Sequence, residues 1–526
     1  MRKLSSPSLS DFLFLAILIW LFVATPGGWS SLLADGDTGW HIRTGDYILD
    51  HRAIPHHDIF SFSKPGETWF AWEWGADVIF ALLVRAGGLK ALVLFCGVLI
   101  ALFVTLVFRL ALAKGANPFI TLALSLLAIG ATSIHYLARP HLFTLVLLPV
   151  SLAILERDRH IWLLVPLTVL WTNLHGGFMA FLACFALWLI THPTLRLAAC
   201  LLLCSAATLI NPYGYQLHGH ILSYLRSDWI REVVHEFQSP SFRSENMAHY
   251  EILLLVGLMT AGSLLLRRRY AESLWILFWA HQSLVSVRHV TIYVAVAVPL
   301  IAAELTDRWN LLAVRYGQRS VAGILDAVAR DMVPQFRRSS AWPALAVASL
   351  LVLPGRWPQD FPAVRFPIPT IEKFSARFPQ ARLLTVDQWA DYLLYRFYPG
   401  VRVFVDGRSD FYGPQIGKDY LRLLSGQHNW RALLDRYRFD LILIPPDWAL
   451  ASLLKEDRQW QLLADDGAAL LFERSQPLAA QRVTVNLGPP LMKIALPAEQ
   501  TERDLRAMRI ASKTMTAARP RGERAE

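Results

Sequence analysis

Acidic, basic and imidazole side chains gather at the ends of long apolar segments in this chain. The first apolar segment is followed by Asp35-Gly36-Asp37-Thr38-Gly39-Trp40-His41. Later segments end in or lead into Arg139-Pro140-His141, Asn173-Leu174-His175-Gly176-Gly177, Asn211-Pro212-Tyr213-Gly214 and Arg288-His289. Ionisable groups at membrane depth are costly and usually mark a site or a pathway. These residues are therefore the candidates for chemistry.

The residue types indicate phosphate-leaving chemistry. Carboxylates such as Asp35 and Asp37 can take a proton from a hydroxyl or hold a divalent metal. Guanidiniums such as Arg139 and Arg288 match phosphate oxygens. Because phosphate leaves readily once its charge is stabilised, a lipid phosphate and a hydroxyl or amine acceptor need no strong acid. The sequence has no P-loop, GxSxG or HExxH motif, so nucleotide-driven, serine and zincin chemistry lack support.

Each of these residues also has a simpler structural role. Asp37 would serve as the N-cap of a helix over 38–49. Arg139 and Arg288 would reach lipid headgroups, and His175 would pack beside two glycines. We favour a shared site because the predicted topology places all of these groups on the same face.

Composition identifies the class of protein. Of 526 residues, 54% are hydrophobic and 17% are charged, against about 45–50% and about 25% in soluble domains. This composition excludes collagen, a coiled coil, a disulfide scaffold and a disordered chain. We predict a polytopic α-helical membrane protein with about eleven transmembrane helices. The predicted spans are 11–28, 89–110, 118–137, 142–155, 161–174, 177–191, 196–210, 250–266, 272–287, 289–305 and 340–356.

The distribution of cations predicts the topology. With the N-terminus inside, the inner loops collect most of the basic residues, including the triplet Arg267–Arg269, as the positive-inside rule expects. The net charge of +10 therefore reflects topology and indicates no nucleic-acid partner. The apolar segment 76–84 is short and is predicted to lie in the outer interface.

The ordered motifs resemble those of a known superfamily. An opening D-x-D-T-x-W-H, an R-P helix end, N-x-H-G-G and N-P-Y-G together resemble the GT-C membrane glycosyltransferases, and more closely uncharacterised bacterial multi-pass proteins of that superfamily. The resemblance covers roughly residues 1–475 and implies a polyprenyl-phosphate or polyprenyl-diphosphate sugar donor in a bacterial inner membrane. It maps Asp35 and Asp37 to the acidic motif that serves as base or metal ligand. Gly39 departs from the family, where Trp is frequent.

These considerations define a predicted site. Asp35 and Asp37 are the predicted catalytic residues, and with His41, four residues from Asp37 on the same helix face, they are the predicted ligands of a possible divalent metal. No cofactor is certain. Glu73, a carboxylate between Trp72 and Trp74, indicates a sugar-stacking or interface site, and an interfacial aromatic belt is an equal alternative. The full set of predicted substrate-binding residues is His41, Glu73, Arg139, His141, Asn173, His175, Arg288 and His289.

Three regions are predicted. Residues 1–355 form the GT-C-like transmembrane domain, with outer loops at 29–88 and 211–248. Residues 356–475 form an extracytoplasmic α/β domain after a proline-rich linker. Within it, Asp406-Gly407-Arg408 is interpreted as a turn with an internal ion pair rather than a ligand site. Residues 476–526 form a polar tail. The predicted strands are 382–386, 401–406, 440–444 and 468–473.

The preferred function is sugar transfer from a polyprenyl-phosphate carrier to a glycan, lipid or protein acceptor outside the cytoplasm. The partners are then a lipid-linked sugar donor, that acceptor and the membrane. One alternative is a transporter or flippase for a polar lipid or glycan, although the chain shows no internal repeat of the kind that transporters share. Another is a non-catalytic envelope assembly protein whose function lies in the C-terminal domain.

Overall fold

The computed structural model describes residues 7–24, 27–336, 338, 340–352 and 357–475. The predicted tail, 476–526, and residues 353–356 of the predicted linker lie outside this part of the chain. The chain divides into two compact units. The first comprises the described residues up to Pro55 with Phe70–Ile221 and Ser239–Pro362, and the second comprises His56–Trp69, Leu222–Gln238 and the described residues from Ala363 onward. Parts of both predicted outer loops thus belong to the second unit.

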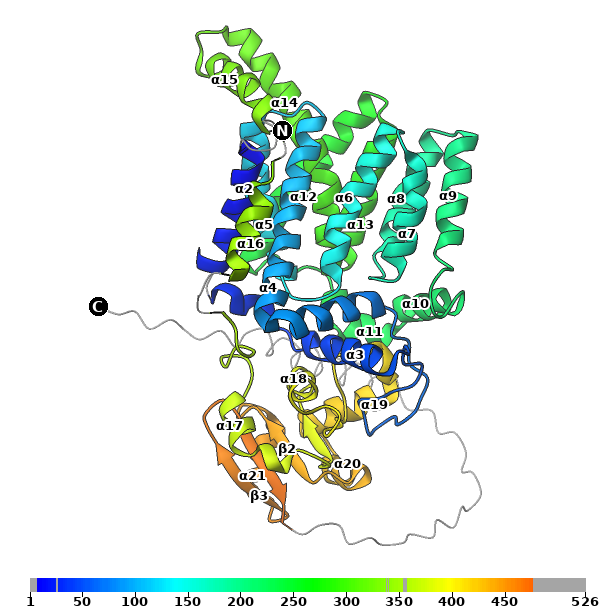
Figure 1. The fold of residues 1–526 in the computed structure, drawn as a ribbon, viewed down its shortest axis with the longest axis vertical. Helices are drawn as coiled ribbons and strands as arrows, with labels where there is room; N and C mark the ends of the chain where they lie inside the picture. Colours follow the sequence, from blue (N-terminus) through cyan, green and yellow to red (C-terminus); the bar gives the residue numbers. More distant parts are fainter. Residues whose placement is uncertain (1–6, 25–26, 337, 339, 353–356, 476–526) are drawn as a thin grey trace, which may run out of the picture. The chain divides into compact units, whose positions relative to one another are not determined.

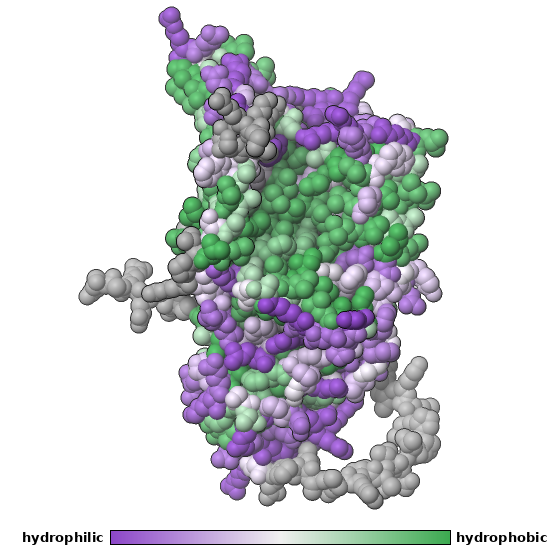
Figure 2. All heavy atoms as spheres, viewed as in Figure 1, coloured by the Kyte–Doolittle hydropathy of each residue, from purple (hydrophilic) through white to green (hydrophobic). Residues whose placement is uncertain are grey.

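The first unit is a helical bundle in which α6, α7, α8 and α9 run side by side (Figure 1). Hydrophobic residues cover the flank of these helices in Figure 2. The helices of this unit are α2 (Leu9–Ile19), α3 (Asp37–His51), α4 (Trp74–Ala113), α5 (Pro118–Thr132), α6 (His141–Arg157), α7 (Leu164–Thr172), α8 (Phe178–Thr191), α9 (Leu195–Ala207), α12 (Glu245–Leu266), α13 (Tyr270–Val285), α14 (Val290–Tyr316), α15 (Val321–Phe336) and α16 (Trp342–Val352). A further helix, α10 (Gln216–Arg226), contributes residues to both units.

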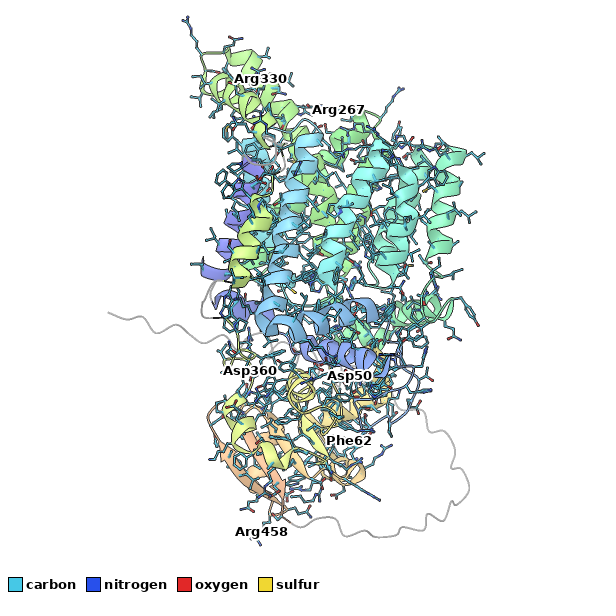
Figure 3. All side chains as sticks on the ribbon, viewed as in Figure 1. Asp50, Phe62, Arg267, Arg330, Asp360 and Arg458 are labelled. Carbon is cyan, nitrogen blue, oxygen red and sulfur yellow. The ribbon has the colours of Figure 1, made fainter. Side chains whose placement is uncertain are left out.

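Four helical segments of the described chain are long and apolar enough to cross a membrane, and five shorter apolar helices accompany them. The four are Trp74–Ala113, Pro118–His135, Met247–Leu266 and Val287–Tyr316. The number of spans therefore stays a prediction. Within the first unit, Arg267 and Arg330 lie at one end of the bundle and Asp50 at the other (Figure 3), which agrees with the charge pattern used to predict the topology.

Helix α4 bends sharply at Gly87 and Gly88. Gly88 has a φ of 64°, which only glycine adopts at little cost, and it separates a first part from the long apolar part that follows. The predicted interfacial segment 76–84 lies in that first part. Because of the bend, the first part of α4 and its apolar part run in different directions.

The first part of α4 packs closely against α3. A Cβ atom at Gly45 would lie 2.0 Å from the carbonyl oxygen of Asp77, so only glycine permits this crossing. Arg85 of α4 forms ion pairs of 2.7 Å with both Asp46 and Asp50 of α3. The close crossing and the ion pairs together fix the position of α3 on α4.

The N-terminus of α3 differs from its prediction. The helix begins at Asp37, and its N-cap is Gly36. The amide of Asp37 donates to Asp35 Oδ1 at 2.9 Å, so the side chain that satisfies the helix terminus is that of Asp35 and not that of Asp37. The carboxylate of Asp37 is thereby available for another partner.

The second unit contains a four-stranded sheet in the order β1-β2-β4-β3. Strands β1 (Leu383–Thr385) and β2 (Leu441–Ile444) are parallel, and β4 (Leu470–Arg474) runs antiparallel to β2 and to β3 (Trp460–Asp465). Its helices are α11 (Asp228–Val233), α17 (Ile368–Lys373), α18 (Asp387–Phe397), α19 (Ser409–Leu424), α20 (Trp430–Tyr437) and α21 (Ala449–Glu456).

The predicted strand 401–406 is wrong. Of these residues only Val403 forms β-bridges, and these are isolated bridges to Ser61 and Leu383. The amide of Val403 donates to Phe60 O, and its carbonyl accepts from the amide of Phe62, both in the short segment 56–69. Strand β3 was not predicted, since Trp460 is its one buried residue and the rest show no alternation of buried and exposed positions.

Segment 56–69 is held in the second unit by a buried ion cluster. Arg408 Nη2 donates to Asp406 Oδ2 at 2.6 Å and to Asp58 Oδ1 at 2.8 Å, and Tyr412 donates to the same Asp406 oxygen at 2.7 Å. Burial alone would lower the pKa of Arg408, but the negative charges of Asp406 and Asp58 hold that pKa above its ordinary value. The predicted internal pair of the turn is confirmed, with Asp58 as an additional partner.

We expect Gly45→Ala to destabilise the first unit by at least about 1–3 kcal/mol, because the added methyl group forces α3 away from α4. Gly262→Ala in α12 is the matched control, since a Cβ there meets no atom within 4 Å. Thermal unfolding of the two purified variants measures the difference. Equal midpoints would contradict the close crossing of α3 and α4.

Candidate active site

Four segments of the first unit bring ionisable side chains together. They are the N-terminus of α3, the N-terminus of α4, the turn before α6 and the turn between α7 and α8. Backbone contacts place the turn before α6 beside α3: the amide of Ala138 donates to Leu32 O at 2.8 Å, and Thr38 Oγ1 donates to Ala138 O at 2.9 Å. These two bonds place the neighbouring residue, Arg139, beside the acidic motif Asp35-Gly36-Asp37.

Arg139 bridges the two predicted catalytic carboxylates. Its Nη1 lies 3.1 Å from Asp35 Oδ2, and its Nη2 lies 2.8 Å from Asp37 Oδ2. A guanidinium suits such a two-carboxylate contact because its donors are fixed in a plane. The three groups carry a combined charge of about −1 when all are ionised.

This arrangement does not fit a divalent metal at the predicted ligands Asp35, Asp37 and His41. The guanidinium of Arg139 is bonded to both carboxylates, and His41 has its own carboxylate partner, described below. Among the described residues, no group of three or more His, Cys, Asp and Glu side chains could hold a metal ion. We therefore derive no step through a metal.

His41 forms a buried pair with Asp77. His41 Nδ1 lies 2.6 Å from Asp77 Oδ1, and both side chains are almost completely buried. The two side chains therefore share one hydrogen bond, and the other ring nitrogen of His41, Nε2, lies on the side of Glu73. Burial lowers the pKa of His41 well below its ordinary value of 6.5, and the neighbouring groups Arg139, His175 and His141 lower it further. His41 is therefore neutral at neutral pH.

Glu73 lies between two imidazoles. Its Oε2 is 3.8 Å from His41 Nε2, and its Oε1 is 3.4 Å from His175 Nε2. Glu73 is also the N-cap residue of α4, where the helix dipole favours a carboxylate. The side chain joins the buried His41–Asp77 pair to the turn between α7 and α8.

The surroundings of His175 fix its tautomer. The amide of Gly177 donates to His175 Nδ1 at 3.0 Å, so Nδ1 is an acceptor and the ring proton is on Nε2, facing Glu73. Thr144 Oγ1 lies 2.7 Å from the same Nδ1 and accepts from Trp171 Nε1 at 2.9 Å. A Cβ at Gly177 would lie 2.1 Å from Thr144 Oγ1, so this contact requires glycine.

The remaining predicted residues fall into two groups. His141 joins the cluster: its ring centroid is 6.5 Å from that of His175, and its Nε2 donates to His135 O at 2.6 Å. Asn173 has a positioning role, because its side chain accepts from Trp74 Nε1 and its carbonyl accepts from the amide of Gly75. These bonds tie the start of α4 to the turn that carries His175.

Arg288 and His289 lie in a 3₁₀ turn, Val287–His289, before α14. His135 Nε2 is 3.4 Å from the carbonyl of Val287, which brings this turn beside the cluster. The ring of His289 instead bonds to Gln282 O at 3.2 Å and packs on Trp279. His289 is thus held by α13.

Asp77 is the functional candidate that the sequence did not reveal as such. It lies in an apolar segment, ADVIFALLV, that was read only for its hydrophobicity. A single carboxylate among apolar residues beside a membrane is costly, so the presence of Asp77 in this segment could have marked it as a functional candidate.

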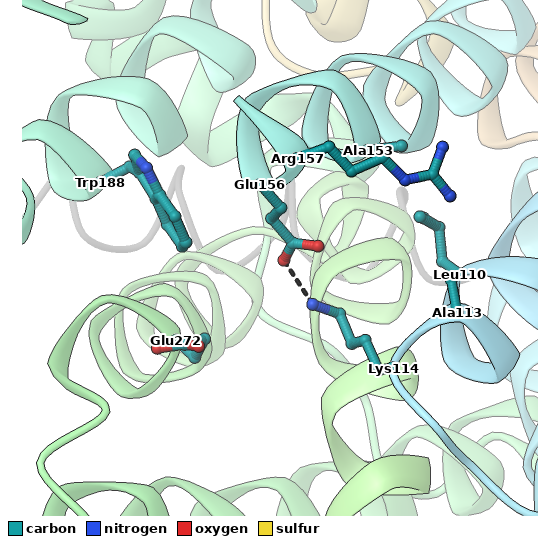
Figure 4. A pocket seen from close by; sticks show the side chains of 8 residues that line it. All are labelled: Leu110, Ala113, Lys114, Ala153, Glu156, Arg157, Trp188 and Glu272. Atoms are coloured by element: carbon teal, nitrogen blue, oxygen red, sulfur yellow. Dashed lines mark hydrogen bonds and ion pairs between the residues drawn. The ribbon is translucent and has the colours of Figure 1, made fainter. Parts of the chain in front are cut away.

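Two cavities lie at the other end of the apolar part of α4. The larger, of about 650 Å³, is lined by residues that include Arg109, Pro149 and Arg157. In the smaller, of about 270 Å³, Lys114 forms a 2.5 Å ion pair with Glu156 (Figure 4). No predicted site residue is among those that line either cavity in the described chain.

Of three comparisons with known proteins, one finds a similar fold. No family model matches the chain, and no curated protein matches it in sequence. The fold, however, is that of a GT-C membrane glycosyltransferase, as the sequence motifs led us to expect. At 12% identity the likeness shows the fold alone.

Two of the similar solved structures are those of an archaeal oligosaccharyltransferase. The apo crystal structure of the Archaeoglobus fulgidus enzyme matches with a TM-score of 0.51 and 12% identity, over 82% of this chain and 69% of that chain. AglB from Archaeoglobus fulgidus, in complex with an inhibitory peptide and a dolichol-phosphate, matches with a TM-score of 0.53 and 12% identity, over 90% of this chain and 74% of that chain.

The buried neutral His41 predicts a pH dependence of stability. Below pH 6.5 the unfolded histidine takes up a proton while folded His41 stays neutral. The unfolded state therefore binds more protons, and the free energy of unfolding falls as the pH decreases, by up to about 1.4 kcal/mol per pH unit. We expect His41→Asn, which keeps a donor for Asp77, to show a smaller loss between about pH 7.5 and about pH 5.5.

Thermal unfolding at the two pH values measures this difference. His51→Asn, at an exposed position of the same helix, is the control and should keep the full acid-induced loss. An equal loss in wild type and His41→Asn would show that His41 is not held neutral.

Proposed function

We propose that this protein is a membrane glycosyltransferase that moves a sugar from a polyprenyl-phosphate carrier to an acceptor on the extracytoplasmic side of a bacterial inner membrane. The observation that carries the proposal is the convergence of Asp35, Asp37 and Arg139 with Glu73, His41 and His175 in the first unit. The GT-C fold supports it. The complex of AglB with a dolichol-phosphate and an inhibitory peptide is consistent with a lipid-linked donor and a peptide among the possible acceptors.

The proposed reaction breaks the bond between the sugar and the carrier phosphate and forms a bond from the sugar to an acceptor oxygen or nitrogen. The carrier phosphate keeps the electron pair of the broken bond. Charge on this leaving group must be stabilised, which is usually the largest contribution to such catalysis. Arg288, on the turn beside His135, is the proposed phosphate ligand.

The bridge formed by Arg139 changes the role proposed for that residue. A guanidinium shared by two carboxylates has little charge left for a phosphate, because the three groups together are negative. We infer that Asp35, Asp37 and Arg139 act together as a clamp for hydroxyl groups of the sugar and the acceptor. Carboxylates accept from hydroxyls, and the guanidinium keeps both carboxylates in place.

Substitution of the acidic motif tests this function. We expect Asp37→Asn and Asp35→Asn to lower sugar transfer by at least about 100-fold, because each removes one acceptor of the clamp and leaves Arg139 incompletely paired. Asp46→Asn is the matched control on α3: among the described residues Asp46 forms ion pairs with the partly exposed Arg43 and Arg85, and the variant should keep activity within about threefold.

The assay follows radiolabelled sugar from a panel of decaprenyl-phosphate hexoses into a product in membranes that contain the full-length protein. Each variant is checked for its amount in the membrane and its elution as a folded species. Full activity in both Asp35→Asn and Asp37→Asn would end the assignment. Lipid movement across the bilayer without any product would favour a transporter.

A further inference from the structure

We propose that the space between α4 and α6 is a binding site for an anionic phospholipid, whose phosphate groups are held by Arg109 and Arg157. This space, the α4–α6 groove, is the larger of the two cavities described above, and it lies at the opposite end of both helices from the candidate active site. The proposal goes beyond sugar transfer, because it concerns a lipid that stays bound and does not react. The residues that line the groove are Leu106, Arg109, Leu110, Ala113, Pro149, Val150, Ala153, Ile154 and Arg157.

The lining of the α4–α6 groove combines an apolar surface with two cations. Leu106, Val150 and Ile154 are half-buried and form apolar walls. Arg109 comes from α4 and Arg157 from α6, and no Asp or Glu is among the described residues that line the groove. A hydrocarbon chain matches the apolar walls, and guanidiniums match phosphate oxygens. The lining therefore suits an amphiphilic anion, in which a hydrocarbon chain carries phosphate.

A proline and small side chains explain why there is space between the two helices. Pro149 lies inside α6, where a proline removes one backbone hydrogen bond and usually bends the helix. Ala113 of α4 and Ala153 of α6 line both cavities, so methyl groups stand where larger side chains would fill the gap. The groove has a volume of about 650 Å³, which is within the range of ligand sites. Because Ala113 and Arg157 are exposed, a lipid can enter it from the surface.

The acidic residues beside the groove have other cations as partners. Three ion pairs account for them: Lys114–Glu156 at 2.5 Å, Arg196–Asp158 at 3.2 Å and Arg269–Glu272 at 2.8 Å. In Figure 4 the guanidinium of Arg157 points away from the Lys114–Glu156 pair. Arginine is a permanent cation, so the two arginines of the lining give the groove a charge of +2. This charge favours an anionic lipid over a zwitterionic one.

The position of the groove along the bundle suits a lipid headgroup. Glu272 lines the smaller cavity next to it and pairs with Arg269, so the groove lies at the end of the bundle that carries Arg267 and Arg330 (Figure 3). A hydrophilic band borders the hydrophobic flank of the bundle at this end (Figure 2). The charge pattern predicts that this end faces the cytoplasm. Basic pockets between helices on that side of a membrane bind anionic headgroups.

A phospholipid with two phosphates fits the groove better than a polyprenyl phosphate does. The two guanidiniums come from different helices, one for each phosphate of a cardiolipin. Along α6 the lining extends from residue 149 to residue 157, about 12 Å at the helical rise, which matches part of an acyl chain and is short for a polyprenyl chain. Cardiolipin is therefore the probe. The simpler alternative is ordinary lipid that fills the gap with no preference for its headgroup.

Native mass spectrometry of the full-length protein in detergent measures the bound lipid directly. At equal lipid concentrations we expect the occupancy by cardiolipin to exceed that by phosphatidylethanolamine at least about fivefold. The double variant Arg109→Gln, Arg157→Gln should lower cardiolipin occupancy at least about tenfold, because it removes both cations of the groove. The matched control is Arg268→Gln, Arg319→Gln, which removes the same charge from two exposed arginines of predicted inner loops and should stay within about twofold of wild type.

Ala153→Phe tests the shape of the groove with both arginines in place. The larger side chain occupies the space beside Ala113, so we expect cardiolipin occupancy to fall at least about fivefold. Thermal unfolding is the second measurement. Cardiolipin should raise the unfolding midpoint of wild type and of the matched control, and should leave the midpoints of the groove variants unchanged. Elution as a folded species is checked first, and either groove variant carries the test if the other fails to fold.

Three results would overturn the proposal. The first is equal occupancy by the two phospholipids in wild type, or equal losses in the groove variants and the matched control, since the lipid would then bind without a specific site. The second is decaprenyl phosphate that binds more tightly than cardiolipin and is lost in the double arginine variant. The third is displacement of cardiolipin by an excess of sodium phosphate, which would show a site for free phosphate. None of these results depends on whether the protein transfers sugar.

Discussion

The hydrogen bond between His41 and Asp77 is the contact on which the candidate site depends. It exists because α3 crosses the first part of α4 at Gly45, where a side chain would collide with the backbone of Asp77. A buried carboxylate and a buried imidazole are each costly alone and acceptable as a pair. Once this pair is in place, His41 Nε2 faces Glu73, and the start of α4 is fixed relative to the acidic motif at the start of α3.

Glycine and asparagine residues perform most of the positioning around this pair. Gly177 lets Thr144 approach closely enough to contact His175, and its amide selects the tautomer of that ring. Asn173 bonds to the side chain of Trp74 and to the amide of Gly75, which anchors the helix that carries Glu73. The motif Asn173-Leu174-His175-Gly176-Gly177 therefore positions the start of α4 and the ring of His175. Its polar residues need not all contact a substrate.

Part of this site could be predicted from the sequence. Charge counting placed Asp35, Asp37, Arg139 and His175 at the same end of the bundle, and the structure brings them together. The sequence could not show that both carboxylates would share one guanidinium, because that depends on two backbone hydrogen bonds between distant loops. Asp77 was missed because its neighbours are apolar. In the second unit, residues 401–406 have the composition of a strand, but their backbone bonds to segment 56–69, a long-range contact that no local pattern encodes.

The proposed function requires that a polyprenyl-phosphate sugar bind where α3 and α4 begin. The most direct measurement is a cryo-electron microscopy structure of the full-length protein with a decaprenyl-phosphate hexose. We predict density for the sugar within hydrogen-bond distance of Asp37 and Glu73, with the phosphate near Arg288. Density for the lipid phosphate at Arg109 and Arg157, at the far end of α4, with none beside Glu73, would contradict the account.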